Sequence, residues 1–372
     1  MKTLTRVAVI ATAAALALAA CGDAPADEPT AEPTSTVEET TEETTSAEEP
    51  TAEEVDFLGC IVSDAGGFDD KSFNQAGHEG LMRAKSELGI TTAEAESAAP
   101  VDFTPNVESM VNQGCDLTIT VGFLLADATK AAAEANPDAN FAIIDDQSIV
   151  LDNVKPLVFN THEAAFLAGY LAAGYSTTGV VATYGGMAIP PVTIFMDGFV
   201  DGVAYYNEAK GADVTVLGWD KAAQSGQFTG NFDDIAAGQN LTKTFIDSGA
   251  DVILPVAGPV GAGTAAAAQA AGNVAVIWVD SDGVLTAPEY SSVILTSVLK
   301  QMGPAVFDVV SESVNGNFAA DPYIGTLENE GVALAPFHEF DGAVSAELKA
   351  ELDAIKADIV SGAIVVESQS AP

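Results

Sequence analysis

One stretch decides the fold of this chain: Ser63-Asp64-Ala65-Gly66-Gly67-Phe68-Asp69-Asp70-Lys71-Ser72-Phe73-Asn74-Gln75. It follows an apolar run at 57–62 that has the length and residue types of a buried strand. It precedes residues 77–88, where apolar residues recur at helical spacing. By itself the stretch is more typical of an ordinary strand-to-helix connection in which Asp69 or Asp70 caps the helix. In open α/β sheets, however, such turns lie at the carboxyl ends of strands, where ligands bind.

Outward from this turn, strand and helix patterns alternate along the chain, which predicts parallel sheets. The expected strands cover residues 115–122, 141–146, 154–159, 180–184, 214–218, 251–256, 275–280 and 293–299, with a strand pair near 323–334. The expected helices cover residues 126–135, 163–175, 195–204, 235–248, 263–271, 303–314 and 345–361. Because the pattern restarts at Gly179, we predict an α/β protein with two doubly wound lobes joined by a hinge. We assign residues 55–161 to lobe 1, 162–284 to lobe 2, and 285–372 to a return into lobe 1 and a hinge-spanning segment.

The first 21 residues have the pattern of a bacterial export signal. A positive start is followed by the short apolar run 7–20, and Leu18-Ala19-Ala20-Cys21 resembles the lipobox of lipoproteins. We therefore expect Cys21 to carry lipid and the mature protein to be anchored to the extracytoplasmic face of the cell membrane. A plain secretory signal is the alternative.

Residues 22–54 form an acidic, threonine-rich linker without lysine or arginine. Its low apolar content and one-sided charge predict a disordered tether. Whether it carries sugars stays open.

The composition excludes whole classes of partner. The chain has 54 acidic and 13 basic residues, for a formal charge of −41. Nucleic-acid binding needs clustered lysine and arginine, so we do not expect it, and a free phosphate ligand is also disfavoured. Beyond Cys21 only Cys60 and Cys115 remain, a pair that could form a disulfide in an exported protein or stay as two buried thiols.

Seven motifs, in this order and spacing, resemble the basic membrane protein family of substrate-binding lipoproteins, whose best-understood members are purine nucleoside receptors of ABC importers. They are 64–75, 141–145, 163–170, Gly198-Phe199 with Gly202-Val203, 249–253, Val279-Asp280-Ser281-Asp282, and Thr296-Ser297 with Lys300. The resemblance covers nearly all of residues 55–366. It implies a type I periplasmic-binding-protein fold with a small-molecule ligand in the cleft between the lobes. It also implies permease and ATPase subunits as partners, no cofactor and no enzymatic activity, and we expect a monomer.

The resemblance further implies a set of ligand-binding residues. They are Asp64, Phe73, Asn74, Asp145, Phe232, Gly258, Asp280 and Lys300. Two phenylalanines could stack on the faces of a purine, and a carboxylate and a lysine could bind the ribose hydroxyls. For the lobe 2 aromatic, Phe228 is an alternative to Phe232, because the spacing around residues 219–231 departs from the family pattern.

Other functions find less support in the residues. The run 258–264 lies between a strand and a helix but lacks the Gly-Lys-Ser/Thr ending of a nucleotide-phosphate loop. His78, His162 and His338 do not have metal-ligand spacing. The alternatives are a lipoprotein of the same fold that binds a sugar or a similar ligand, an adhesin or regulatory lipoprotein that has lost its ligand, and a nucleoside-processing enzyme in which paired acids hold calcium.

Overall fold

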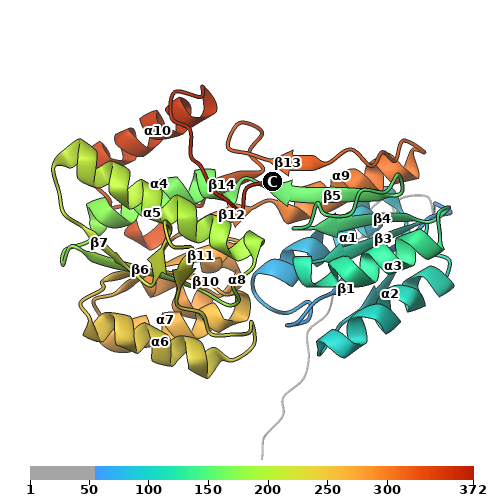
Figure 1. The fold of residues 1–372 in the computed structure, drawn as a ribbon, viewed down its shortest axis with the longest axis horizontal. Helices are drawn as coiled ribbons and strands as arrows, with labels where there is room; N and C mark the ends of the chain where they lie inside the picture. The colour runs from blue at the N-terminus through green and yellow to red at the C-terminus, as the bar shows by residue number, and fades with distance from the viewer. Residues whose placement is uncertain (1–54) are drawn as a thin grey trace, which may run out of the picture. The chain divides into compact units, whose positions relative to one another are not determined.

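The computed structural model describes residues 55–372, which contain two six-stranded sheets (Figure 1). In sheet order, the first consists of β13 (Tyr323–Gly325), β5 (Val154–Phe159), β4 (Asn140–Ile144), β3 (Leu117–Val121), β1 (Leu58–Ser63) and β2 (Thr91–Ala95). The second consists of β14 (Val332–Leu334), β12 (Ile294–Lys300), β11 (Ala275–Asp280), β10 (Val252–Val256), β6 (Val180–Gly185) and β7 (Thr215–Leu217). All neighbouring strands are parallel except β12 and β14. Lobe 1 and lobe 2 below mean the bodies built on these two sheets.

Helices cover both sheets. They are α1 (Phe73–Leu88), α2 (Phe103–Asn112), α3 (Ala126–Ala135), α4 (Thr161–Tyr175), α5 (Pro190–Lys210), α6 (Ile235–Asp247), α7 (Gly261–Ala271), α8 (Gly283–Thr286), α9 (Met302–Val314) and α10 (Ala346–Val360). A small hairpin, β8 (Trp219–Asp220) with β9 (Ser225–Gly226), projects from lobe 2. The central strands β3, β10 and β11 are wholly buried, as parallel strands covered on two faces must be, whereas the edge strands β2 and β7 are partly exposed.

The two lobes share one topology, so each strand of lobe 1 has a counterpart in lobe 2. Strands β1, β3, β4 and β5 occupy the positions that β6, β10, β11 and β12 occupy in the second sheet. The expectation of two doubly wound lobes is therefore confirmed.

Helices α4 and α5 pack closely against each other in lobe 2. A Cβ atom at Gly169 would lie 2.0 Å from the carbonyl oxygen of Phe199, and one at Gly202 would lie 2.0 Å from that of Phe166. The glycines of these two motifs thus serve packing, because only a residue without a side chain fits there.

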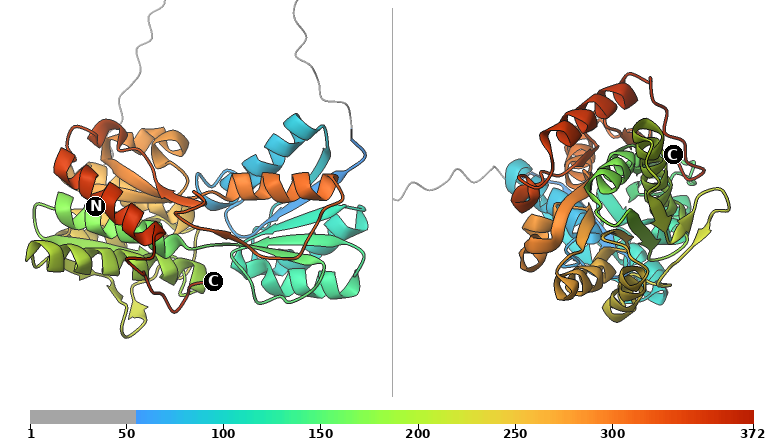
Figure 2. Two further views of the ribbon diagram at one scale, coloured as in Figure 1. Left: turned by 90° about the horizontal axis from the view of Figure 1, so that it is seen from above. Right: turned by 90° about the vertical axis from the view of Figure 1, so that its left-hand side faces the viewer.

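The last third of the chain differs from our expectation. We expected residues 293–299 to return to lobe 1, but β12 pairs with β11 in lobe 2. Only α9, which packs on α1, and β13, which pairs with β5, belong to lobe 1 (Figure 2, left). Helix α10 packs on α4 in lobe 2. The expected pairing of the strands near 323–334 was also wrong, because β13 and β14 lie in different sheets.

Several elements extend or supplement the predicted ones. Strand β2 and helix α2 both lie within residues 89–114, a range in which we expected no helix or strand. Helix α1 begins at Phe73 rather than near residue 77, and α5 begins at Pro190 rather than near 195. Both early starts bring side chains of the first helical turn to the cleft between the lobes.

Cys60 and Cys115 are joined by a disulfide, with their Cα atoms 5.9 Å apart. Cys60 lies in β1 and Cys115 just before β3, its neighbour in the sheet. The bond therefore links adjacent strands at the base of lobe 1. The predicted signal sequence, Cys21 and the acidic linker lie outside the described residues.

Candidate functional site

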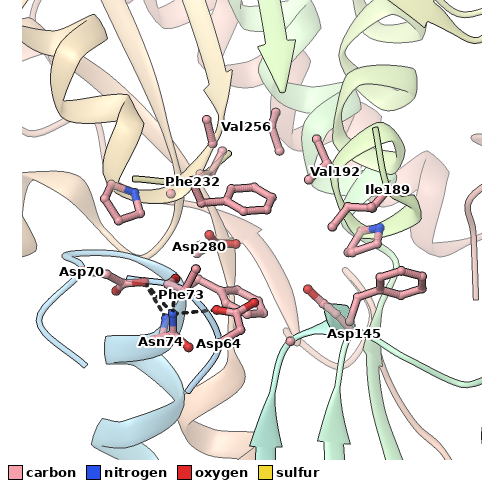
Figure 3. Close-up of a pocket in the computed structure, with 18 of the residues that line it drawn as sticks. Asp64, Asp70, Phe73, Asn74, Asp145, Ile189, Val192, Phe232, Val256 and Asp280 are labelled. Carbon is pink, nitrogen blue, oxygen red and sulfur yellow. Dashed lines mark hydrogen bonds between the residues drawn. The ribbon is translucent and has the colours of Figure 1, made fainter. Parts of the chain in front are cut away.

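A pocket lies between the lobes, at the carboxyl ends of their strands (Figure 3). Its empty space is about 530 Å³ with the part open to solvent included, within the usual range of small-molecule sites. It is lined by Asp64, Ala65, Asp70, Phe73, Asn74, Gly122, Phe123, Asp145, Ile189, Pro191, Val192, Phe195, Phe232, Val256, Ala257, Gly258, Pro259, Val279, Asp280 and Lys300. Every ligand-binding residue named from the sequence is among them.

Equivalent strands of the two lobes supply equivalent acids. Asp145 follows β4 and Asp280 ends β11, and both have the left-handed backbone, with φ of 66° and 68°. Non-glycine residues seldom adopt this conformation, and it is typically kept where function requires it. The two carboxylates thus approach the pocket from opposite lobes.

Lys300 connects these two acids. Its side chain is only 3% exposed, and its Nζ lies 2.6 Å from Asp145 Oδ2 and 3.6 Å from Asp280 Oδ1. Burial alone would lower the pKa of Lys300, but the attraction of Asp145 and Asp280 outweighs it and leaves that pKa raised. Lys300 therefore remains a cation at the point where the chain crosses from β12 to α9.

The first turn of α1 forms the lobe 1 edge of the pocket. Asp70 accepts hydrogen bonds from the backbone N–H groups of Ser72, Asn74 and Gln75, at 3.0, 2.8 and 3.1 Å. This carboxylate satisfies donors that a helix start leaves unpaired, which explains why α1 can begin at Phe73. The N-cap residue is Ser72, so the expectation that Asp69 or Asp70 is the N-cap was wrong, although the Asp70 side chain does bond the first N–H groups of the helix.

Asn74 links the two acids of this edge. Its Nδ2 donates to Asp64 Oδ1 at 2.9 Å and to Asp70 Oδ2 at 3.3 Å (Figure 3). The opposite orientation of the amide would place its oxygen against the Asp70 carboxylate and the Ala65 carbonyl, so these two contacts favour the orientation with Nδ2 on this side.

Two phenylalanine rings lie on different sides of the pocket. Phe73 comes from α1 of lobe 1, and Phe232 comes from the loop before α6 of lobe 2 (Figure 3). Gly186 makes room for the second ring, because a Cβ atom there would lie 2.3 Å from it. Phe228 does not line the pocket and instead packs edge-to-face on Trp219, with ring centroids 6.0 Å apart. Of the two candidate aromatics, the structure places Phe232 at the site.

Direct hydrogen bonds join the two lobes beside the pocket. Ser72 Oγ donates to Asp280 Oδ2 at 3.0 Å, and Ser281 Oγ donates to the Ser72 carbonyl at 3.2 Å. The start of α1 is therefore tied to the end of β11.

Gly258 begins the turn between β10 and α7 and has a φ of 53°. A Cβ atom there would meet nothing within 4 Å, so the positive φ rather than crowding accounts for the glycine. Its backbone lines the pocket, as its lobe 1 counterpart Gly122 does after β3.

Sequence reasoning missed two parts of the lining. Gly122 ends the predicted strand at 115–122 and Phe123 follows it, so the rule that ligands bind at strand ends could have found both. The apolar wall from Ile189 to Phe195 was missed because the start of α5 was predicted too late, although the Pro190-Pro191 pair is typical of the first positions of a helix and could have placed that start.

Two absences apply to residues 55–372 alone. This part of the chain contains no group of three or more histidine, cysteine or acidic side chains placed to hold a metal ion. It also contains no helix long and apolar enough to cross a membrane.

The two-lobed fold with a cleft at the strand ends is shared with solved solute-binding proteins. A solved solute-binding protein of an ABC transporter from Aeropyrum pernix superposes with a TM-score of 0.76 at 25% identity, covering 84% of this chain and 94% of that one. Residues 58–370 match the family described as ABC transporter substrate-binding protein PnrA-like, or Bmp. The chain belongs to this family and is an ABC transporter substrate-binding protein.

Curated relatives support the same assignment. The ABC transporter nucleoside-binding protein BmpA of Lactococcus lactis is 34% identical, covering 85% of this chain and 90% of the relative. Basic membrane protein A of Borreliella burgdorferi is 31% identical, covering 87% and 91%.

Proposed function

We propose that this chain is the extracytoplasmic receptor for a purine nucleoside, which it delivers to the permease of an ABC importer. One observation carries the proposal. Phe73 of lobe 1 and Phe232 of lobe 2 line the same cleft as Lys300 and the two acids that pair with it, Asp145 and Asp280. Flat aromatic surfaces and charged hydrogen-bonding groups in one pocket match a ligand with a flat base and a hydroxylated sugar.

The base would bind between the two phenylalanines. Stacking of a base on an aromatic side chain contributes about 1–3 kcal/mol and tolerates different bases. Because one ring comes from each lobe, a base between them would also hold the lobes together.

The ribose would bind at the other end of the pocket. Asp280 can accept hydrogen bonds from two hydroxyl groups, and Lys300 can donate to them. Hydrogen bonds to charged groups contribute about 1.5–3 kcal/mol each, so this end would discriminate between sugars. Asp145 would hold Lys300 in place through their 2.6 Å contact.

A phosphate group fits this pocket poorly. Lys300 is the one cation among its lining residues, whereas Asp64, Asp70, Asp145 and Asp280 are acids. The repulsion of a phosphate by these acids supports a nucleoside rather than a nucleotide as ligand.

The remaining parts of the proposal concern the protein as a whole. We infer that Cys21 carries a lipid that anchors the protein, since the lipobox pattern precedes it directly. We further infer that the receptor acts as a monomer and without catalysis.

A thermal-shift screen tests the function. Inosine, guanosine and adenosine should raise the unfolding temperature, because a ligand that binds only the folded state stabilises it. Glucose, galactose, ribose and nucleotides serve as comparison ligands. Chromatography of the incubated nucleosides should show no free base.

A shift with a sugar alone would favour the sugar-binding alternative. Release of free base would make the protein an enzyme. A shift with none of these compounds would contradict the nucleoside assignment.

A further inference from the structure

The pocket holds more negative groups than one cation can neutralise. Asp64, Asp70, Asp145 and Asp280 all line it, and Lys300 is its one basic side chain. His78, His162 and His338 lie outside the lining. Carboxylates gathered in a buried space resist simultaneous ionisation, so the partners of each acid determine which one keeps a proton.

Three of the four acids have partners that stabilise a negative charge. Asp145 and Asp280 share Lys300, and Asp280 also accepts from the Ser72 hydroxyl. Asp70 accepts three backbone N–H bonds at the start of α1. These contacts favour the ionised forms and oppose the effect of burial, which raises the pKa of Asp70 and of Asp145.

Asp64 lacks such partners. Its side chain is 7% exposed, and among the described residues no cation lies within ion-pair distance of it. Its hydrogen bond from the neutral Asn74 amide occupies Oδ1. Within residues 55–372, Oδ2 has no hydrogen-bond partner.

The free oxygen of Asp64 lies against Gly122. A Cβ atom at Gly122 would come within 2.3 Å of Asp64 Oδ2, and Gly122 itself has a φ of 116°. The glycine therefore leaves room for this carboxyl group in the pocket, in a backbone conformation that other residues avoid.

Electrostatics agree with this geometry. Burial raises the pKa of Asp64 to about 8, and repulsion from Asp70, Asp145 and Asp280 adds to the rise, against the lowering effect of the Asn74 hydrogen bond. At neutral pH the carboxyl group is then mostly protonated. Since Oδ1 accepts from Asn74, the proton belongs on Oδ2.

We propose that Asp64 binds the ligand as a neutral carboxylic acid whose Oδ2–H donates a hydrogen bond to an acceptor atom of the ligand. This inference rests on the proposed function and adds a specificity rule to it. The ligand atom facing Asp64 is an acceptor, such as a ring nitrogen or a carbonyl oxygen of the base. An ionised Asp64 would instead demand a donor there.

The proposal has a definite pH signature. Binding to the protonated form leaves the affinity constant below about pH 8, and raises Kd about tenfold per pH unit above it. Lys300 keeps its charge in this range because its own pKa is raised. Burial also raises the pKa of Asp70 and of Asp145, so substitution of Asp64 itself has to identify the titrating group.

Calorimetric titration with adenosine at about pH 6.5 and about pH 9 tests this signature, since the base of adenosine does not titrate in that range. For the parent, Kd should be about tenfold higher at the alkaline pH. In Asp64→Asn the side-chain amide offers a donor that does not titrate, so the ratio of the two Kd values should fall to about one. Asp69→Asn, at an 88% exposed neighbouring side chain, is the control and should keep the parent ratio.

A flat parent profile, or an unchanged ratio in Asp64→Asn, would overturn the proposal. A ligand-free measurement separates this failure from that of the proposed function. Infrared difference spectra at neutral pH should show a protonated carboxyl band that Asp64→Asn removes and that disappears as the pH rises through about 8. If the band is absent, Asp64 is not protonated, and the proposal made here is wrong whichever ligand binds. If the band is present but adenosine does not bind, Asp64 is protonated and the proposed nucleoside ligand is wrong.

Discussion

At the scale of single residues, the cleft combines charges that must be held in place. The left-handed backbone of Asp145 and Asp280 brings a carboxylate from each lobe to Lys300. Asp280 has the further partner Ser72, so one carboxylate contacts Lys300 at the end of β12 and the N-cap residue of α1. If the proposed function holds, substitutions here should affect binding of the sugar and binding of the base differently.

Removal of Asp280 should weaken ribonucleoside binding. We expect Asp280→Ala to cost about 1.5–3 kcal/mol of binding free energy through lost charged hydrogen bonds. The loss should be smaller for a deoxynucleoside that lacks one of the hydroxyls. Calorimetry of parent and variant with both kinds of nucleoside measures the difference, and equal losses would remove Asp280 from the sugar site.

The two lobe 2 phenylalanines offer a matched comparison. Phe232→Ala should weaken nucleoside binding by about 1–3 kcal/mol, because the stacked surface is lost. Phe228→Ala should lower the unfolding temperature through its lost contact with Trp219, with a smaller effect on Kd. A larger binding loss in Phe228→Ala than in Phe232→Ala would reverse our assignment.

Residue patterns located most of the site because its members follow recognisable strand ends. The acids after β4 and at the end of β11, and the turn after β1, have this signature in the sequence. The wall formed by Ile189 to Phe195 consists of apolar residues that look like any buried helix face. Only the fold shows that the first turn of α5 reaches the cleft.

At the scale of elements, the start of α1 connects the lobes. Its Ser72 contacts Asp280 and Ser281 of lobe 2, and Gly66 of the preceding loop lies beside Pro259, since a Cβ atom there would be 3.5 Å from the proline ring. The loop that contributes ligand-binding groups is thus also an interlobe contact.

Loss of the Ser281 hydroxyl should therefore weaken ligand binding without touching the ligand. Ser281→Ala removes a hydrogen bond worth about 0.5–1.5 kcal/mol in the closed arrangement, which corresponds to a Kd about two- to tenfold higher. Ser248→Ala, at an exposed serine ending α6, should leave the Kd unchanged. Identical Kd values for parent and Ser281→Ala would show that this contact does not hold the lobes together.

Sequence patterns predicted where helices and strands lie in the chain better than they predicted which strands pair in a sheet. Residues 126–135, 154–159 and 275–280 have the predicted bounds. Strand β12 was identified but assigned to the wrong lobe, because a buried parallel strand has the same apolar pattern in either sheet. The short strands β13 and β14 have three residues each, too few for the pattern to specify a pairing.

At the scale of the whole molecule, three crossings join the lobes. The chain passes from β5 to α4, returns from β12 to α9, and passes again from β13 to β14. Lys300 ends the strand at the second crossing, so the buried cation of the pocket lies where the chain passes between the lobes. Such multiple crossings are compatible with a hinge motion in which the lobes close on a ligand.

Anchoring is tested on the whole chain in cells. Cys21→Ala removes the thiol to which a lipid would be attached, so the protein should move from the membrane fraction to the soluble or secreted fraction. The measurement is immunoblotting of the two fractions. Equal membrane retention of parent and variant would contradict lipid attachment at Cys21.

The central claim, that one cleft binds the base and the sugar of a nucleoside together, is tested most directly by calorimetric titration of the parent protein with inosine, hypoxanthine and ribose at neutral pH. We predict that inosine binds at least about tenfold more tightly than either fragment. Hypoxanthine can make only the stacking contacts and ribose only the charged hydrogen bonds, whereas inosine can make both. Binding of hypoxanthine or ribose as tight as that of inosine, or no binding of inosine, would contradict it.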